Sequence, residues 1–391
     1  MNLADWTNDP LPIDAARAAM VGRIWNPRVE GPSVVAVHNG EVFDISAAAP
    51  TIRDLCEADD PAGMARVANG QSFGSLTDIL QNTPRENRDP SRPWLIAPID
   101  LQAIKAAGVT FAVSMLERVI EEQARGAPDR AAAIRSEINA AIGDDLARLK
   151  PGSSQAAALK ALLIEKGMWS QYLEVGIGPD AEVFTKAQLM SAVGHLAEAG
   201  LHPKSSWNNP EPEVALAVSS AGRIVGATLG NDVNLRDFEG RSALLLSKAK
   251  DNNASTSVGP FIRLFDDGFT LDDVRQTELA LIVEGEDGFR LEGMSDLGQI
   301  SRDPEDLVRQ TIGREHQYPD GFVLYLGTMF APTKDRGAPG QGFTHKIGDV
   351  VTIAAPRLGR LANVMVHSPD AEPWTFGAGA LMRNLARRGL L

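Results

Sequence analysis

The sequence of 391 residues contains a single cysteine, Cys56, and no long apolar run. One cysteine cannot form a disulfide within the chain, which fits a reducing compartment. No apolar stretch approaches the roughly 20 residues that a membrane-spanning helix needs. The first residues, MNLADWTNDPLPIDAARAAM, lack a basic segment leading into an apolar core, so no secretory signal is expected. We therefore expect a cytoplasmic protein without a membrane partner.

Positive charge is also scarce, because 38 Lys and Arg residues oppose 51 Asp and Glu residues and the net charge is -13. A surface of this sign repels phosphate backbones, so we expect no nucleic-acid partner. The sequence also lacks a phosphate-binding glycine loop, an internal repeat and a low-complexity segment. Its length favours two domains, or one domain with large additions.

Three regions differ in their periodicity. Residues 1–100 combine short helical segments with SVVAVHNGEVFDIS, in which Asn39-Gly40 predicts a hairpin, and indicate a small N-terminal α+β domain. Residues 101–168 contain alanine-rich segments such as DRAAAIRSEINAAIGDDLARL and predict a helical segment packed on the next domain. Residues 169–391 contain several strand-like segments and predict a strand-rich domain. The expected fold class is α+β.

Two acids, Glu211 and Glu213, precede the apolar segment VALAV. Because side chains alternate along a strand, both carboxylates should face the same way. A short antiparallel connection would bring Asp232, at the end of the next strand-like segment, beside them. Three neighbouring carboxylates with no Cys or His suit Mg²⁺ or Mn²⁺, which removes the cost of crowding buried negative charge. Spacing alone leaves open the alternative of a solvated strand end.

Five segments in order resemble the fumarylacetoacetate hydrolase family: NNPEPEVAL, GATLGNDVNLRDFEG, LLLSKAKD, GTMFAP and HKIGDVVTI. The similarity runs from about Phe184 to about Val364. The whole chain is most similar to the branch of bacterial 2-keto-3-deoxy-D-xylonate dehydratases, through AGVTFAVSMLERVIEE, WSQYLEV, HQYPDG and PWTFGAGALMRNLARRGLL. The resemblance implies that residues 169–391 form the catalytic domain, a mixed β-roll, and that the protein is a homodimer or higher homo-oligomer.

The resemblance also implies roles for individual residues. Glu211, Glu213 and Asp232 would hold a divalent cation, usually Mg²⁺, with Mn²⁺ as the alternative. The implied substrate-binding residues are Lys186, Arg236 and Thr328. A further family lysine that contacts the substrate matches Lys248, although Lys250 is close enough to leave the register open.

One departure from the family pattern concerns the reaction. Hydrolases of the family carry a histidine with an acidic partner in a short helix, whereas GVTFAVSMLERVIEEQ has no histidine. The resemblance therefore implies a lyase: metal-dependent dehydration of 2-keto-3-deoxy-D-xylonate, or a related pentonate, to 2-oxoglutarate semialdehyde in non-phosphorylative pentose oxidation. The alternatives are a hydrolase or decarboxylase of acylpyruvate-type β-dicarbonyl acids, and a binding protein without enzymatic activity.

The dehydration requires a base within hydrogen-bonding distance of the C3 proton. Glu182 is the candidate, because its segment leads directly into the F-x-K word at Lys186. Lys248 is an alternative base, and His316 is a third candidate for proton transfer to the leaving hydroxyl. A surface position is an open alternative for each of these residues.

Overall fold

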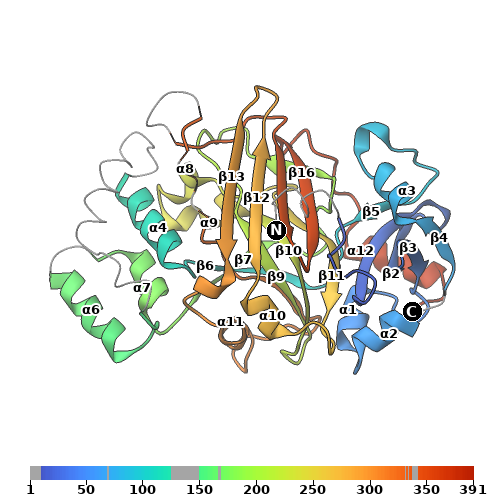
Figure 1. The fold of residues 1–391 in the computed structure, drawn as a ribbon, viewed down its shortest axis with the longest axis horizontal. Helices are drawn as coiled ribbons and strands as arrows, with labels where there is room; N and C mark the ends of the chain where they lie inside the picture. The colour runs from blue at the N-terminus through green and yellow to red at the C-terminus, as the bar shows by residue number, and fades with distance from the viewer. Residues whose placement is uncertain are drawn as a thin grey trace.

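The computed structural model describes residues 10–67, 70–124, 149–165, 169–330, 332, 334–336 and 342–391. The fold is α+β, as predicted: two mixed sheets stand at the centre of the molecule, with helices around them (Figure 1). The two sheets share a large apolar core, to which strands of both contribute. The candidate site is positioned by the middle strands of the larger sheet.

The larger sheet has eleven strands in the order β4-β3-β2-β1-β11-β10-β9-β14-β6-β7, and β5 pairs with β1. Only β14 and β6 pair in parallel, and the other neighbours are antiparallel. The strands are β1 (Met20–Asn26), β2 (Gly31–His38), β3 (Glu41–Asp44), β4 (Ser72–Ser75), β5 (Trp94–Ile96), β6 (Ala103–Gly108), β7 (Glu182–Ala187), β9 (Pro212–Val218), β10 (Ile224–Asp232), β11 (Thr256–Leu264) and β14 (Phe322–Tyr325).

The smaller sheet has five strands in the order β13-β12-β15-β16-β8. These are β8 (Glu198–Leu201), β12 (Glu278–Glu284), β13 (Arg290–Asp296), β15 (Val350–Ala355) and β16 (Gly359–His367). Strand β8 pairs with β16 in parallel, so this sheet is mixed as well.

The described helices lie around the sheets. At one end of the molecule, beyond β6 and β7, are α4 (Ala112–Ala124), α6 (Ser154–Glu165) and α7 (Gln171–Ile177) (Figure 1). At the other end are α1 (Ile52–Glu57), α2 (Pro61–Val67), α3 (Leu76–Gln81) and the C-terminal α12 (Ala378–Arg387). Four further helices in the described residues connect the central strands: α8 (Arg236–Glu239), α9 (Leu246–Lys250), α10 (Leu271–Arg275) and α11 (Pro304–Thr311).

Strand β9 is buried on both faces, because it lies in the middle of the larger sheet. Its alternation is the one expected from the sequence: Val214, Leu216 and Val218 enter the core between the two sheets. Ala215 and Ala217 contribute to a second core on the opposite face. Glu213 shares that second face by the same two-residue period.

The predicted hairpin at Asn39-Gly40 is confirmed, because β2 and β3 pair with His38 opposite Glu41. Both turn residues have positive φ, 51° and 76°, as the two-residue turn requires. The expected boundary at residue 100 is crossed by the larger sheet, in which β1 pairs with β11. The division into three domains therefore stays a prediction.

The predicted helical segment is only partly helical. Ala103–Gly108 forms strand β6, so the helical interpretation is wrong there. Its alanines favour a helix in isolation, but Ile104 and Ala106 point into a core of the sheet, and that burial overrides local propensity. The predicted helix at 129–149 lies, except for its last residue, outside the described residues.

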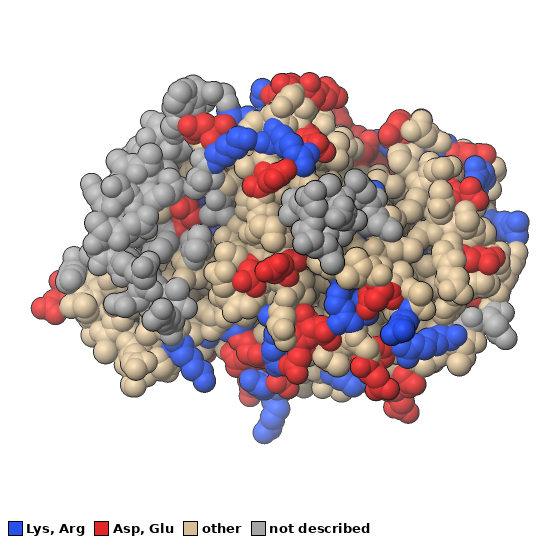
Figure 2. All heavy atoms as spheres, viewed as in Figure 1, with Lys and Arg blue, Asp and Glu red and all other residues tan. Residues whose placement is uncertain are grey.

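Acidic and basic side chains are interspersed on the face shown in Figure 2. Among the helices that the structure describes, none has the length and apolar character needed to span a bilayer.

Candidate metal centre and active site

The three carboxylates of Glu211, Glu213 and Asp232 meet where β9 begins and β10 ends. The two strands pair antiparallel, with Gly230 opposite Glu213, and the Asp232 amide donates to the Glu211 carbonyl over 3.0 Å. One oxygen from each of the three side chains lies within 4.8 Å of the other two, and all three residues are buried. Antiparallel pairing thus produces the predicted cluster, because it returns the chain to its starting edge.

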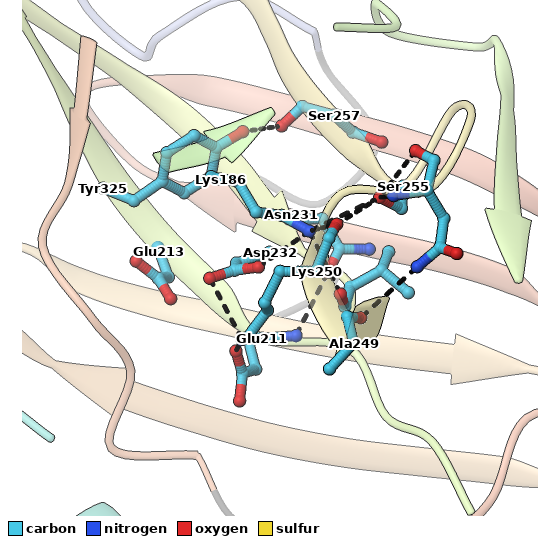
Figure 3. A network of polar contacts seen from close by, with 12 residues as sticks. Lys186, Glu211, Glu213, Asn231, Asp232, Ala249, Lys250, Ser255, Ser257 and Tyr325 are labelled. Atoms are coloured by element: carbon cyan, nitrogen blue, oxygen red, sulfur yellow. Dashed lines mark hydrogen bonds and ion pairs between the residues drawn. The ribbon is translucent and has the colours of Figure 1, made fainter. Parts of the chain in front are cut away.

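Two buried lysines neutralise part of this negative charge (Figure 3). Lys250 Nζ lies 2.6 Å from Glu211 Oε2 and 3.2 Å from Asp232 Oδ2. Lys186 Nζ lies 3.0 Å from Asp232 Oδ1, and it also donates to the backbone carbonyls of Val233 and Lys250. The two ammonium groups therefore fix the orientation of the Asp232 carboxylate.

Glu213 has a different environment from the other two acids. Among the ion pairs in the described part of the chain, none involves Glu213, and its Oε2 accepts the Gly327 amide over 2.7 Å. Burial, followed by the charges of Asp232 and Glu211, raises the pKa of Glu213 well above its usual value. Burial also acts to raise the pKa of Asp232, but Lys186 and Lys250 outweigh it and lower that pKa.

The donor set fits a hard divalent cation. It consists of carboxylate oxygens alone, gathered in a buried position where an added positive charge would relieve the repulsion felt by Glu213. Asn231 supports the arrangement, because its side-chain oxygen accepts the Glu211 amide over 3.1 Å. Glu211, Glu213 and Asp232 would hold the ion.

The structure does not bring Lys248 to the carboxylates. Lys248 is exposed, with its Nζ 5.7 Å from the centre of the Phe238 ring, whereas Lys250 is buried in the cluster. Both lysines lie on the short helix α9, and residues two apart on a helix point to nearly opposite sides. Lys250, the alternative that the sequence left open, therefore replaces Lys248 at the site.

Lys186 is fully buried. Its ammonium group is surrounded by the Asp232 carboxylate, two backbone carbonyls and the Ser255 hydroxyl. It is not among the residues that line either hollow beside the carboxylates. The geometry therefore favours a role in holding Asp232 over the substrate contact expected from the sequence.

Glu182 lies at the start of β7 and lines the same hollow as Glu211, Glu213, Asp232 and Lys250. Burial and the charge of Glu239 raise its pKa from 4.5 to about 7, against the opposing effects of Arg118 and Lys250. A carboxyl group with this pKa can both accept and release a proton near neutral pH.

Two small hollows, each of about 20 Å³, lie beside the carboxylates. Thr328 follows β14 and lines both of them, and Arg236 lines the one that Glu117 and Asn209 also border. Arg236 Nη2 lies 3.2 Å from Glu117 Oε2, and its guanidinium group is 4.5 Å from the centre of the Trp207 ring. Two of the three predicted substrate-binding residues, Arg236 and Thr328, thus border the site.

Three residues outside the predicted set also belong to the site, and two of them, Glu117 and Arg118, were interpreted from the sequence as surface charges of a helix, with a lid over the substrate as the alternative. Arg118, on α4, lies 2.5 Å from Glu211 Oε1 and 3.0 Å from Glu239 Oε2. Glu117, the preceding residue, pairs with Arg236. The adjacent opposite charges Glu117 and Arg118 were visible in the segment that lacks the family histidine, but only the docking of α4 shows that they face Arg236 and Glu239.

None of the six histidines, all of which are described, lines these two hollows. His316 is exposed and borders a different hollow with Lys105 and Tyr318, so the structure does not bring it to the carboxylates. A separate hollow of about 350 Å³ is lined by Trp25, Trp94 and Trp374. None of the three carboxylates of the candidate metal centre lines it.

Comparisons with known proteins agree with this geometry. Residues 209–366, which include the three acids, Arg236, Lys250 and Thr328, match the fumarylacetoacetate (FAA) hydrolase C-terminal family. A 2-dehydro-3-deoxy-D-arabinonate dehydratase from Saccharolobus solfataricus is 30% identical over 183 residues, 46% of this chain and 57% of that protein. The chain thus matches little more than half the length of that relative.

A protein of Haloferax volcanii named "Probable 2-keto-3-deoxyxylonate dehydratase" is 25% identical over 333 residues, 84% of this chain and 94% of that protein. Among solved structures, 2-keto-3-deoxy-D-arabinonate dehydratase complexed with magnesium and 2,5-dioxopentanoate has a TM-score of 0.62 at 18% identity, covering 89% of this chain and 99% of that one. A 2-hydroxyhepta-2,4-diene-1,7-dioate isomerase from Mycobacterium marinum has a TM-score of 0.52 at 19% identity, covering 90% and 99%.

The two structural likenesses establish a common fold for enzymes of different activity, whereas the sequence match covers the residues of the metal centre. Residues 209–366 thus match the fumarylacetoacetate hydrolase C-terminal family, as the five segments of the sequence predicted.

Proposed function

We propose that this protein is a Mg²⁺-dependent hydro-lyase that converts a 2-keto-3-deoxypentonate, such as 2-keto-3-deoxy-D-xylonate, into 2-oxoglutarate semialdehyde. The observation that carries the proposal is the position of Glu182, whose carboxyl group lines one hollow with Glu211, Glu213 and Asp232. The dehydratase names of the two curated relatives support the same reaction class.

Glu211, Glu213 and Asp232 would hold the cation, with Mn²⁺ as an alternative to Mg²⁺. When bound, the cation would supply Lewis acidity that polarises the C2 ketone and makes the C3 hydrogen more acidic. The solved relative complexed with magnesium and 2,5-dioxopentanoate supports this assignment, because 2,5-dioxopentanoate is the same compound as 2-oxoglutarate semialdehyde.

Glu182 acts as the base. Its raised pKa, about 7, leaves a substantial fraction ionised at neutral pH and gives the carboxylate a basicity suited to removing the C3 proton. Glu182 takes the C3 proton, the C3–H electrons form the C3–C4 double bond, and the C4 hydroxyl leaves as water after receiving that proton from Glu182. The ionised Glu182 can then move a proton from C5 to C3, which gives an enol with a C4–C5 double bond. Passage of the enol hydroxyl proton to C4 yields the aldehyde.

Lys250 remains a cation throughout. Burial acts to lower its pKa, but the charges of Asp232, Glu211 and Glu239 outweigh burial and raise that pKa above its usual value. Lys250 is therefore unsuited to proton abstraction, which leaves Glu182 as the base. Its ammonium group instead keeps Glu211 and Asp232 oriented.

Arg236 and Thr328 would hold the substrate carboxylate. The Arg236 guanidinium group is buried between Glu117 and the Trp207 ring, so its orientation is fixed before the substrate enters. Positioning of this kind reduces the entropy that must be lost on the way to the transition state.

A product assay tests the proposal. Purified protein is incubated with four 2-keto-3-deoxy acids, the pentonates and hexonates of both C4 configurations, with Mg²⁺ or with a chelator. We expect 2-oxoglutarate semialdehyde from a pentonate with Mg²⁺ and no product with the chelator. Cleavage or decarboxylation of acylpyruvates, with no turnover of any deoxy acid, would refute the dehydratase and support the hydrolase or decarboxylase.

A further inference from the structure

Glu211, like Asp232, is shared between two cationic side chains. Its Oε2 bonds Lys250 over 2.6 Å, and its Oε1 bonds Arg118 over 2.5 Å. Each oxygen that could bind a cation therefore already accepts a charged hydrogen bond. A divalent ion that takes Glu211 as a ligand must share the carboxylate with one of these two side chains or displace it.

Of these two side chains, Arg118 is the one that can move away from Glu211. Lys250 is held by two carboxylates, Glu211 and Asp232, and its side chain is only 3% exposed. Arg118 belongs to a peripheral helix, α4, and its side chain is 13% exposed. Its guanidinium group already has a second carboxylate, because Nη1 lies 3.0 Å from Glu239 Oε2. Moving toward Glu239 would leave the arginine paired and Glu211 Oε1 available.

The position of Arg118 also affects the space beside the metal centre. Arg118 lines both small hollows, each of which has room for about one water molecule. A five-carbon acid is far larger than either hollow, and the shared residues separate the two. Arg118 and Ser114 are the shared residues that come from α4, so movement of this helix surface would join the hollows.

We propose that Arg118 is a positioning residue that competes with the divalent cation for Glu211, weakens cation binding, and moves to Glu239 when the cation binds. The inference rests on the metal centre of the proposed function. The guanidinium group and the metal ion would bind the same Glu211 oxygen, and because both are positively charged, the presence of one weakens the binding of the other. Glu239 supplies the alternative partner, so the displacement does not leave a buried arginine unpaired.

The test measures Mn²⁺ affinity by calorimetry and, independently, by the electron paramagnetic resonance signal of free Mn²⁺. Wild type is compared with Arg118→Gln and with Arg241→Gln, which removes the same charge from an exposed arginine near α8. Loss of one charged hydrogen bond to Glu211 should tighten Mn²⁺ binding by about tenfold in Arg118→Gln. Arg241→Gln should bind Mn²⁺ like wild type.

The outcomes separate this inference from the proposed function. Unchanged or weaker Mn²⁺ binding by folded Arg118→Gln overturns the competition, because an arginine that merely supported the site would lower the affinity when removed. Equal tightening in Arg241→Gln also overturns it, since the effect would then be one of net charge. If wild type binds no Mn²⁺, the metal centre itself fails.

A second variant covers the case in which Arg118→Gln does not fold. Arg118→Lys keeps the charge but has one nitrogen, and so it cannot bridge Glu211 and Glu239 as the guanidinium group does. We expect Mn²⁺ binding that is a few-fold tighter than in wild type. Affinity equal to or below that of wild type in this variant contradicts the proposal.

Discussion

Gly108 faces Glu182 across the pair formed by β6 and β7, and a β-carbon at position 108 would come within 2.2 Å of Glu182 Oε2. Gly108 is therefore a glycine for a steric reason, since any side chain there would occupy the space of the proposed base. The relationship links a residue with no chemistry of its own to the position of a carboxylate on which the proposed reaction depends.

Gly108→Ala should displace the Glu182 carboxylate while the fold is retained, because the nearest atoms belong to the end of a flexible side chain. A shift of about 1 Å of a catalytic group can reduce the rate about a hundredfold, so kcat should fall by one to two orders of magnitude. Steady-state kinetics of pentonate dehydration would measure this fall in kcat. Gly313→Ala is the matched control, because its nearest neighbour would be 3.7 Å from the new carbon.

Glu182→Gln should lower kcat by about 10²- to 10⁴-fold, the usual contribution of a general base, because the amide cannot accept the C3 proton. The variant should still bind Mn²⁺, since Glu182 is not one of the three proposed ligands. Wild-type kinetics in Glu182→Gln would exclude Glu182 as the base, and loss of Mn²⁺ binding would indicate a structural role instead.

The pH dependence of wild-type kcat/KM should report the same residue. Glu182 must be ionised to act as a base, and its pKa is raised to about 7, so kcat/KM should increase with pH and reach half of its plateau near pH 7. In Gly108→Ala, a carboxylate pushed toward water would regain a lower pKa, and the midpoint should move to lower pH. An acid limb near pH 4.5 in wild type would contradict the buried, raised-pKa carboxyl.

The two lysines of α9 allow a matched comparison of stability. Lys250→Met leaves Glu211 and Asp232 without their shared buried cation, and the loss of one partner of a buried ion pair typically costs about 3–5 kcal/mol in the free energy of unfolding. Lys248→Met changes an exposed residue and should cost less than about 0.5 kcal/mol. Urea unfolding with chelator present measures both. Similar losses in the two variants would mean that the lysine assignment is wrong.

The metal ligands could be predicted from the sequence because their geometry is local. The two-residue period of a strand sets Glu211 and Glu213 on one side, and a short antiparallel return brings Asp232 to them. Residues that reach the site from distant elements could not be derived in this way. Arg118 and Glu239 are far apart in the sequence, and nothing in either segment specifies that α4 docks against α8.

The choice between Lys248 and Lys250 shows a second limit of prediction from the sequence. Lys248 and Lys250 both fit the family word, and the choice depends on where the short helix α9 begins, which local sequence leaves uncertain by a residue or two. The strand β6 shows a third, because the alanines of AIKAAG have a helical propensity that pairing with β14 and β7 overrides.

Glu213→Gln tests the centre on which the other predictions depend. The amide oxygen can still accept the Gly327 amide hydrogen bond, so the fold should be retained, but one anionic ligand is lost. In wild type, Mg²⁺ at about 100 times its dissociation constant should add about 2.7 kcal/mol to the free energy of unfolding and raise Tm accordingly. This Mg²⁺-dependent rise in Tm should disappear in Glu213→Gln together with dehydration activity. Glu292→Gln, a change at an exposed acid on β13, should retain the Mg²⁺-dependent rise in Tm and the dehydration activity of wild type. A full Mg²⁺-dependent rise in Tm in Glu213→Gln would show that the ion binds elsewhere, because a site of three carboxylates cannot lose one charge without losing affinity.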